Sequence, residues 1–428
     1  LKNSGNMASK RWSIEIKEFL GFNPGYFWQE ADDETTTLRT SGDPRFANEI
    51  REIDLFRPYG IGPTGARTVL TNGSQAGAVT TLIAYLLDFP TSSGVTFSGG
   101  GSKLYKITPT TVVDDATWPY TIDKTGVTGE TVRGLCHYKG ALYYAYKTSG
   151  SPDIGKYDLN TTFDDDYMST VPAGGAVLPS TDTEHPMVVG GDDIMYIGAG
   201  RYVSKFDGTT FTAQALDLPT EAVITDIKWH SNRLWIATNR NSIAGNNKND
   251  SHIYVWDTVS VSWEYEISVV GRIGSLYVKD GIMYCWWQEV DEVQSSYKFG
   301  YIDGVQINPI LTYSGDLPNY AQVTQYRNHI LWVSGTNIFV YGSIDPNLRK
   351  KFFSAFIGNL ADDVGAIGSP FGNILITSSG VETTDICRIS SSSWSTSSKW
   401  RSPQIRPTNI RQKSILRKIV VNTQPLGD

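Results

Sequence analysis

The sequence predicts an all-β protein built as a β-propeller, because a short apolar segment recurs along it in steps of 40 to 52 residues. Four short strands repeated at this period are typical of a propeller blade. The composition points the same way: the 428 residues include 41 Gly, 23 Tyr and 12 Trp, and only 19% are charged. Aromatic and β-branched residues favour strands, so long helices and coiled coils are not expected.

Seven copies of the apolar segment are recognisable, and each predicts the second strand of a blade. Their anchor residues are Val95, Leu142, Ile194, Leu234, Ile282, Ile330 and Ile374. A first apolar strand precedes most anchors by about ten residues, and a third strand and a more polar fourth strand follow. Neighbouring blades cover both faces of the inner strands, whereas the outermost strand is half exposed and alternates. We therefore expect seven blades over residues 71–405, with six or eight as the alternatives.

An aspartate follows several of the predicted third strands. These residues are Asp158, Asp207, Asp257 and Asp303. An Asp carboxylate accepts hydrogen bonds from backbone N–H groups two residues further on, which suits a tight turn. We expect a turn-forming role for them and not calcium binding or catalysis.

The two ends of the chain depart from the repeat. Residues 1–70 are rich in Gly and Pro and are expected to form an extended N-terminal arm, which can also supply a strand that closes the ring. Residues 406–428 carry Arg406, Arg411, Lys413, Arg417 and Lys418 and predict a basic strand segment. This segment either starts a further β-domain or pairs with another subunit, because a lone strand leaves an open edge.

This order of parts resembles that of propeller-containing virion proteins of tailed bacteriophages, especially tail and tail-nozzle proteins. The resemblance rests on the glycine-rich arm (19–25 and 53–63), the loosely matched blades, and the exit through 400–406 to the basic strand 415–421. It implies a structural virion protein located in the tail, with a propeller followed by a β-sandwich. The likeness is architectural, and fold alone does not fix function.

Charge, cysteines and hydropathy exclude several classes of protein. The formal net charge is -7, which argues against broad or sequence-specific nucleic-acid binding. Cys136, Cys285 and Cys387 lie in apolar runs and are expected to be buried free thiols. The most apolar stretch (82–89) is too short to cross a membrane. The chain starts at Leu1 without a signal-peptide pattern, so we expect a processed polypeptide or part of a longer one.

Tests for enzymatic chemistry yield only weak candidates. The segment 206–211 is the nearest match to a sialidase box, but it lacks the Ser and Trp of that motif. A glycosidase needs two carboxylates at a defined separation. The carboxylates considered for a central channel are Glu184, Asp192, Asp193, Asp226 and Glu289. The acidic run 164–166 is interpreted as a solvated loop.

Histidines and tryptophans were the remaining candidates for a site. His137, His230 and His329 occupy similar positions before the second strand and predict a repeated structural slot. Trp286 and Trp287 are adjacent, which breaks the alternation of a strand and suggests that one of them faces outwards. Such a side chain, or Trp118, Trp263, Trp394 or Trp400, would suit glycan binding. Packing between blades is the alternative for these residues.

The sequence thus favours a non-enzymatic virion structural protein, a propeller module of a phage tail or host-recognition apparatus that forms a homo-oligomeric ring. We expect no catalytic, cofactor-binding or metal-binding residues. The expected partners are other virion proteins, copies of the chain itself and a host surface glycan, without membrane insertion. The alternatives are a glycan-active enzyme, such as a virion depolymerase or glycosidase, and a carbohydrate-binding adhesin or general interaction propeller.

Overall fold

The computed structural model describes the segments of the chain in which strands and their connections are well placed. These are residues 21–22, 46–47, 49–51, 53–57, 60–63, 65–69, 85–87, 96–100, 103–107, 120–125, 131–147, 152–180, 184–240, 250–290, 295–313, 315–342, 352–357, 363–369, 373–379, 384–394 and 399–401. Within these segments the chain is all-β apart from one short helix, α1 (Tyr167–Thr170).

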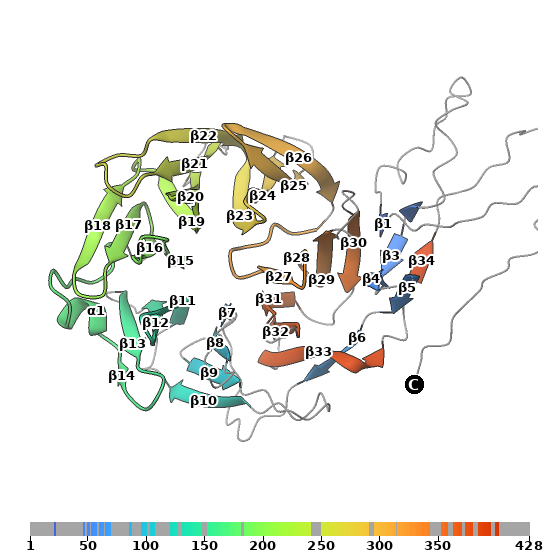
Figure 1. The fold of residues 1–428 in the computed structure, drawn as a ribbon, viewed down its shortest axis with the longest axis horizontal. Helices are drawn as coiled ribbons and strands as arrows, with labels where there is room; N and C mark the ends of the chain where they lie inside the picture. Colours follow the sequence, from blue (N-terminus) through green and yellow to red (C-terminus); the bar gives the residue numbers. More distant parts are fainter. Residues whose placement is uncertain are drawn as a thin grey trace, which may run out of the picture.

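Four-stranded antiparallel sheets stand around a common centre, so the fold is a β-propeller (Figure 1). Five of these sheets follow one another between Thr131 and Ile357 as blades of four consecutive strands, with the first strand of each innermost. The blades are β11 (Thr131–Tyr138), β12 (Ala141–Lys147), β13 (Asp153–Tyr157) and β14 (Phe163–Asp164); β15 (Met187–Val189), β16 (Met195–Ala199), β17 (Tyr202–Phe206) and β18 (Phe211–Asp217); β19 (Ala222–His230), β20 (Arg233–Arg240), β21 (Asp250–Trp256) and β22 (Tyr265–Val270); β23 (Arg272–Lys279), β24 (Ile282–Val290), β25 (Ser295–Asp303) and β26 (Gln306–Tyr313); and β27 (Val323–Tyr326), β28 (His329–Ser334), β29 (Asn337–Gly342) and β30 (Phe352–Ile357).

Two further four-stranded sheets lie between β30 and β11 along the ring. One consists of β7 (Tyr85–Leu87), β8 (Thr96–Gly100), β9 (Lys103–Ile107) and β10 (Tyr120–Thr125). The other consists of β31 (Asp363–Gly368), β32 (Leu375–Ser379) and β33 (Thr384–Trp394), with β6 (Gly65–Val69) as its fourth strand. The propeller prediction is confirmed with five blades, and the count of seven stays a prediction.

Tight turns join the first and second strands of the blades. Backbone φ is positive at Lys139 and Gly140 before β12, at Ser231 and Asn232 before β20, and at Asp280 and Gly281 before β24. Two consecutive positive φ angles match the right-handed twist of a two-residue hairpin, and Asn and Gly adopt them most readily. This is why the predicted second strands begin after Gly, Asp or Asn.

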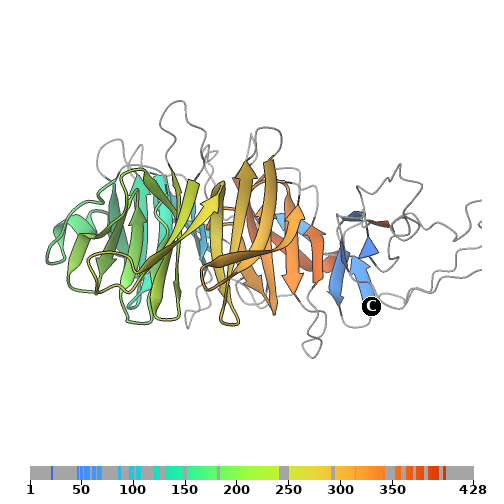
Figure 2. The same cartoon turned by 90° about the horizontal axis from the view of Figure 1, so that it is seen from above.

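The core lies between successive sheets rather than at one centre. All five residues of β16 are buried, whereas the outermost strand β18 alternates between buried and exposed positions. One apolar cluster joins β12 to β16 through Tyr143 and Ile197, and another joins β24 to β28 through Trp286 and Trp332. The predicted difference between inner and outer strands is therefore correct. The blades stand side by side with their strands along the short axis of the ring (Figure 2).

The ring is closed by a strand from the N-terminal arm. β6 pairs antiparallel with β33, with Val69 opposite Cys387 and Thr68 opposite Arg388. Residues more than 300 positions apart in the sequence thus share one sheet. The expectation that the arm supplies a closing strand is confirmed.

The rest of the arm forms a small group of strands beside β30 (Figure 1). It contains β1 (Gly21–Phe22), β2 (Phe46–Ala47), β3 (Glu49–Arg51), β4 (Ile53–Arg57), β5 (Gly60–Pro63) and β34 (Lys399–Arg401). β3 pairs antiparallel with β34, so Ile50 lies opposite Trp400. Segments from both sides of the propeller therefore meet at one flank. The predicted basic segment 406–428 lies outside the described residues.

Ring closure predicts an asymmetric effect of proline in β6. Adjacent residues of a strand direct their N–H groups to opposite edges, and β33 lies along only one edge of β6. Of the two variants Arg67→Pro and Thr68→Pro, one therefore removes a hydrogen bond to β33 and the other does not. We expect the variant that loses this bond to lower the free energy of unfolding by about 1–3 kcal/mol, measured by urea denaturation. Thr68→Val, which keeps the N–H, is the control. Wild-type stability in both proline variants would contradict closure through β6.

Candidate functional site

A repeated β-bulge shapes the inner edge of the ring. The register of the innermost strand shifts between Val132 and Gly134, between Ile224 and Asp226, between Ile273 and Ser275, and between Val364 and Ala366. The extra residues are Arg133, Thr225, Gly274 and Gly365, and each is half-buried between buried neighbours. A bulge re-aims the side chain that it carries. Arg133 is the one charged residue among these four.

Arg133 forms the centre of a polar cluster with Glu184 and Tyr320. Its Nη1 donates to Glu184 Oε1 at 3.0 Å, and the two side chains are 18% and 23% exposed. The Tyr320 hydroxyl lies 3.0 Å from Glu184 Oε2 and also bonds the carbonyl oxygen of Arg133. The cluster joins three separate stretches of the chain, from β11, from the segment before β15 and from the segment before β27.

The segment 315–322 brings Tyr320 into this cluster. It connects β26 to β27 and runs into the middle of the ring (Figure 1). The carbonyl oxygen of Ala321 accepts from Ile367 N at 3.0 Å, and Gln322 Nε2 donates to Val364 O at 2.7 Å. Tyr320 and Ala321 also pack against the apolar cluster around β8 and β11. The segment therefore ties the blade β27–β30 to β31 and to β11 on another side of the ring.

Glycine at position 274 makes room for this crossing segment. A Cβ atom at Gly274 would lie 2.2 Å from the carbonyl oxygen of Pro318, which is too close for any side chain. The same holds for Gly134, where a Cβ atom would lie 2.1 Å from the carbonyl oxygen of His185. Glycines at or beside the bulges thus allow the backbone of Pro318 and of His185 to pass close to the inner strands. The arrangement holds blades together across the centre of the ring.

The other predicted channel carboxylates do not join Glu184. Asp192 and Asp193 follow β15, whereas Glu184 precedes it, so they lie at opposite ends of that strand. Asp193 pairs with Lys139 at 3.3 Å, and Glu289 pairs with Lys298 at 2.5 Å near the end of β24. These carboxylates therefore do not converge, because each acid is held by a partner within its own blade or an adjacent one. A second carboxylate, which glycosidic hydrolysis requires, does not face Glu184 among these residues.

Asp226 is a fully buried link between two blades. It accepts hydrogen bonds from Leu276 N at 2.8 Å and from Ser275 Oγ at 2.9 Å, both on β23 of the next blade. Lys228 Nζ lies 2.6 Å from its second oxygen and balances its charge. A buried charge with a full set of partners stabilises one arrangement of its surroundings. Asp226 therefore fixes the packing of β19 against β23.

The predicted turn aspartates close the turns after the third strands. Asp158 Oδ1 accepts from the backbone N–H of residues 160, 161 and 162 at 2.9–3.0 Å. Asp207 accepts from Thr209 and Thr210, and these backbone hydrogen bonds lower its pKa to about 2. Asp257 accepts from residues 259 and 260. The turn-forming role is confirmed for these three.

The acidic run 164–166 bonds tyrosines of β12. Tyr144 donates to a carboxylate oxygen of Asp165, and Tyr146 donates to Asp166 Oδ1 at 2.8 Å. Nearby, Asp153 is buried in β13, and burial raises its pKa to about 6, with a further contribution from the charge of Asp166. The run thus anchors the segment that leads into α1, while Asp164 and Asp165 stay half-buried and Asp166 is exposed to solvent.

The histidine prediction is wrong in part. His137 is the last residue but one of the first strand β11 and His230 is the last of β19, whereas His329 begins the second strand β28. His137 is exposed, His230 is half-buried and His329 is buried, so the three do not share a slot. Partial desolvation of the imidazole ring lowers the pKa of both His137 and His230. No group of His, Cys, Asp or Glu suited to a metal ion occurs within the described residues.

Neither Trp286 nor Trp287 faces outwards. Trp286 packs with Phe299 and Trp332 towards β28, and Trp287 packs towards β20 on the other face of the sheet. The suggestion of an exposed Trp in this pair is therefore wrong, since both faces of an inner strand are covered. Trp263 packs against the cluster around β20, and the side chains of Trp118, Trp394 and Trp400 lie outside the description.

Two of the three cysteines are confirmed as buried free thiols. Burial raises the pKa of Cys136 to about 12 and also raises that of Cys285, so neither is a nucleophile at neutral pH. The side chain of Cys387 lies outside the described part. No helix in that part is long and apolar enough to span a membrane.

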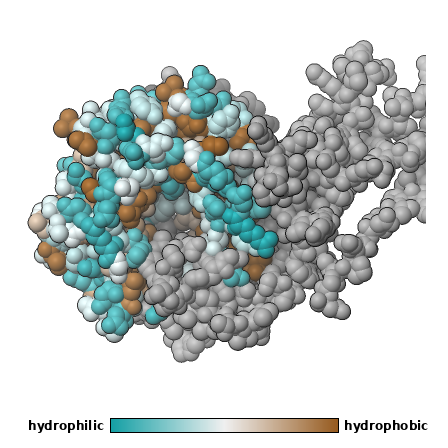
Figure 3. Space-filling model, viewed as in Figure 1, coloured by the Kyte–Doolittle hydropathy of each residue, from teal (hydrophilic) through white to brown (hydrophobic). Residues whose placement is uncertain are grey.

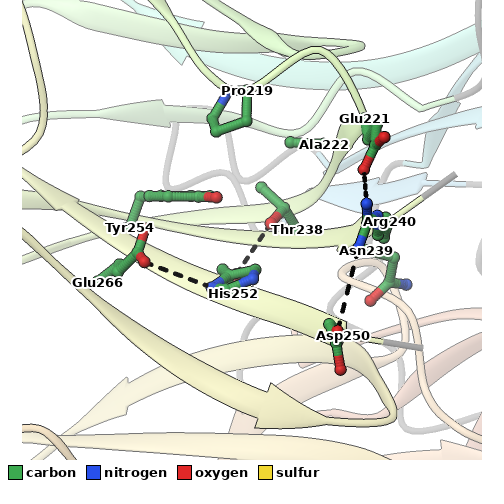
Figure 4. A pocket seen from close by; sticks show the side chains of 10 residues that line it. All are labelled: Pro219, Glu221, Ala222, Thr238, Asn239, Arg240, Asp250, His252, Tyr254 and Glu266. Atoms are coloured by element: carbon green, nitrogen blue, oxygen red, sulfur yellow. Dashed lines mark hydrogen bonds and ion pairs between the residues drawn. The ribbon is translucent and has the colours of Figure 1, made fainter. Parts of the chain in front are cut away.

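A cavity of about 240 Å³ opens between the connection from β18 to β19 and the strands β20 to β22 (Figure 4). Several of its polar groups are already paired: Arg240 forms ion pairs with Glu221 and Asp250, and Thr238 Oγ1 donates to the carbonyl oxygen of His252. The His252 ring lies 4.0 Å from Glu266. The volume is below the range of most ligand sites. The cavity therefore offers few groups to a ligand.

Comparisons with known proteins identify no relatives by sequence. No protein family and no curated protein matches the chain. Among solved structures, it is similar to Drosophila Semaphorin 1b, extracellular domains 1–2, with 8% identity, a TM-score of 0.44 and coverage of 80% of this chain and 88% of that one. It is also similar to a chain of the Mitotic Checkpoint Complex, with 12% identity, a TM-score of 0.46 and coverage of 75% and 99%. Likenesses this distant carry no argument about function.

The polar cluster of Arg133, Glu184 and Tyr320 predicts that the Tyr320 hydroxyl stabilises the ring. Tyr320→Phe removes its bonds to Arg133 and Glu184, so we expect the free energy of unfolding to fall by about 1–2 kcal/mol in urea denaturation. Tyr326→Phe, on the adjacent strand β27, is the control and should change it by less than about 0.5 kcal/mol. Equal effects of the two substitutions would show that the contact of the Tyr320 hydroxyl with Arg133 and Glu184 adds nothing to the free energy of unfolding.

Asp153 predicts a pH dependence of stability. Its folded-state pKa, about 6, exceeds the ordinary value of 3.8, so the folded state binds the proton more tightly. Its contribution to the free energy of unfolding is therefore largest at low pH and is lost as the pH rises through about 4 to 6, by about 1–3 kcal/mol. In urea denaturation at several pH values, the stability of wild type relative to Asp153→Asn should fall as the pH rises through about 4 to 6. Parallel profiles would rule out the raised pKa.

Proposed function

We propose that the chain is a non-enzymatic virion structural protein, a seven-bladed propeller module of a phage tail or host-recognition apparatus that forms a homo-oligomeric ring. Its partners are other virion proteins, copies of itself and a host surface glycan, and it is located in the tail of the virion. In this proposal the molecule acts through its shape: a rigid ring presents two faces of loops, while the arm and the exit segment attach it to neighbours.

The blade count of seven is supported by the two four-stranded sheets that complete the circle. β7 packs beside both β31 and β11, so these sheets lie between the fifth blade and the first. In the second of them, β6 supplies the outer strand from the start of the chain. A ring that shares one blade between its two ends is held shut without a covalent link.

The observation that carries the structural role is the meeting of the arm and the exit at one flank. β3 pairs with β34, and β1, β3 and β4 approach the outer strand β30. The ring is thus attached to the rest of the chain at one side, and both of its faces are left for contacts. Such a geometry suits a module held out from an assembly better than a freely diffusing enzyme.

The polar groups of the centre support a non-enzymatic role. Glu184 is engaged by Arg133 and Tyr320, and Asp226 is engaged by β23. Polar and apolar residues are mixed over the face of the ring seen in Figure 3, as on an ordinary protein surface. These features favour a scaffold over a catalyst.

The test is a density-gradient separation of the source lysate, probed with an antibody against this chain. The proposal predicts that the chain sediments with DNA-filled particles at a fixed, low copy number and stays attached after repeated washing. Recovery only in soluble or cell-envelope fractions would contradict it.

The glycan-active alternative has its own readout. Release of sugars from host polysaccharide by the purified chain, lost in Glu184→Ala or Asp193→Ala, would replace the proposal with an enzyme. Saturable glycan binding by a monomer that does not assemble would favour an adhesin. The proposal expects neither result.

A further inference from the structure

The outer strand β22 has an unusually open edge. It lies at the rim of the ring, and its pairing with β21 runs from Asp250 and Val270 to Val255 and Tyr265 without a register shift (Figure 1). Its sequence, Tyr-Glu-Ile-Ser-Val-Val, contains no proline, lysine or arginine. A regular strand with free N–H and C=O groups is a template for another strand.

The other outer strands of the described blades are protected. β14 has only two residues and is followed by α1, and β18 is bulged and bonds Ala173 near its start. β26 carries Pro309 and a register shift, and β30 is approached by β1, β3 and β4. β10 carries Asp123 and Lys124 at its own register shift. Bulges, prolines, charges and covers are the usual means of blocking an edge, and β22 has no bulge, proline or covering strand and a single charge, at Glu266.

Exposed apolar side chains stand at both ends of β22. At the end where the strand starts, Val259 and Val261 are 87% and 95% exposed in the turn from β21. At the other end, Val270 is 71% exposed. An antiparallel partner of the same sequence would bring its Val270 end to the end that carries Val259 and Val261. The edge is therefore complementary to itself.

We propose that β22 pairs with the β22 strand of a second copy of this chain, antiparallel about a two-fold axis, to form one continuous sheet across two blades. The axis stands perpendicular to the sheet, so each face continues from one copy into the other. Facing residues must then both be odd-numbered or both even-numbered, which centres the pairing on one residue.

Strand length and charge together select the centre of the pairing, since centring on Ile267 or Ser268 pairs five residues of β22 and centring on Val269 pairs only three. With Ser268 facing its own copy, Ile267 faces Val269 and Glu266 faces Val270 of the second copy. The two Glu266 carboxylates are then four residues apart along the strands, about 14 Å, where screening leaves little repulsion. Centring on Ile267 would halve that separation and leave Val270 beyond the paired strand. A second copy needs no other partner to supply a matching strand, and an isologous contact of this kind is the commonest in homo-oligomers.

The contact does not rest on the proposed function, and the test uses the purified full-length chain. Sedimentation equilibrium should show a concentration-dependent dimer. Ser268→Lys places two ammonium groups opposite each other and should raise the dimer dissociation constant at least about tenfold. Val305→Lys, at an exposed valine in the turn between β25 and β26, is the matched control and should leave dimerisation unchanged.

A cysteine pair tests the register. Under mild oxidation Ser268→Cys should form a disulfide-linked dimer, because the two residues face each other. Glu266→Cys is equally exposed on the same strand but should not cross-link, since its copies are too far apart. A wild-type chain that remains monomeric, a Ser268→Lys dimer as tight as wild type, or cross-linking through Glu266→Cys in place of Ser268→Cys would overturn the proposal.

Discussion

Closure of the ring is the constraint on which the rest of the structure depends. Inner strands such as β16 and β28 are buried on both faces, so their blades need a neighbour on each side, and a ring with a gap would expose two such faces to water. β6 meets this need by pairing with β33, which holds the start of the chain against its last sheet. The same closure brings β3 to β34, so the flank that carries both segments is a consequence of how the ring is shut.

Polar groups in the centre support the closure and do not compete with it. Asp226 bonds backbone and side chain of the next blade, while Tyr320 reaches Arg133, 187 residues earlier in the sequence. The carboxylate of Asp226 and the phenol of Tyr320 are groups of the kind that act as acids or bases in enzymes. Their hydrogen bonds are with the protein itself, and an unmade bond at these buried positions would be costly. The acid groups thus hold the blades in place.

The repeat was predictable because it is local: an apolar run after a Gly, Asp or Asn turn identifies β12, β20, β24 and β28 from a few residues each. The turn role of Asp207 was predictable for the same reason. The Tyr320 crossing was not predictable, since it depends on which blades face each other across the ring. The Arg133 position did carry a signal in the sequence. Residues 132–135 consist of an apolar residue, a variable residue, a small or polar residue and a second apolar residue, and residues 224–227, 273–276 and 364–367 follow the same pattern. The adjacent residues Trp286 and Trp287 gave a wrong expectation of exposure. The alternation of a strand predicts an exposed side chain only where one face of the sheet is open to solvent, and both faces of β24 are covered.

Native-state hydrogen exchange measures closure most directly. If β6 is an integral strand of the ring, the amides that bond β6 to β33 exchange only through large-scale opening, with protection close to that of inner strands such as β12 and β24. Protection of β6 no greater than that of an exposed loop, alongside protected inner strands, would contradict the account. It would show a ring that stays together without the strand from the arm.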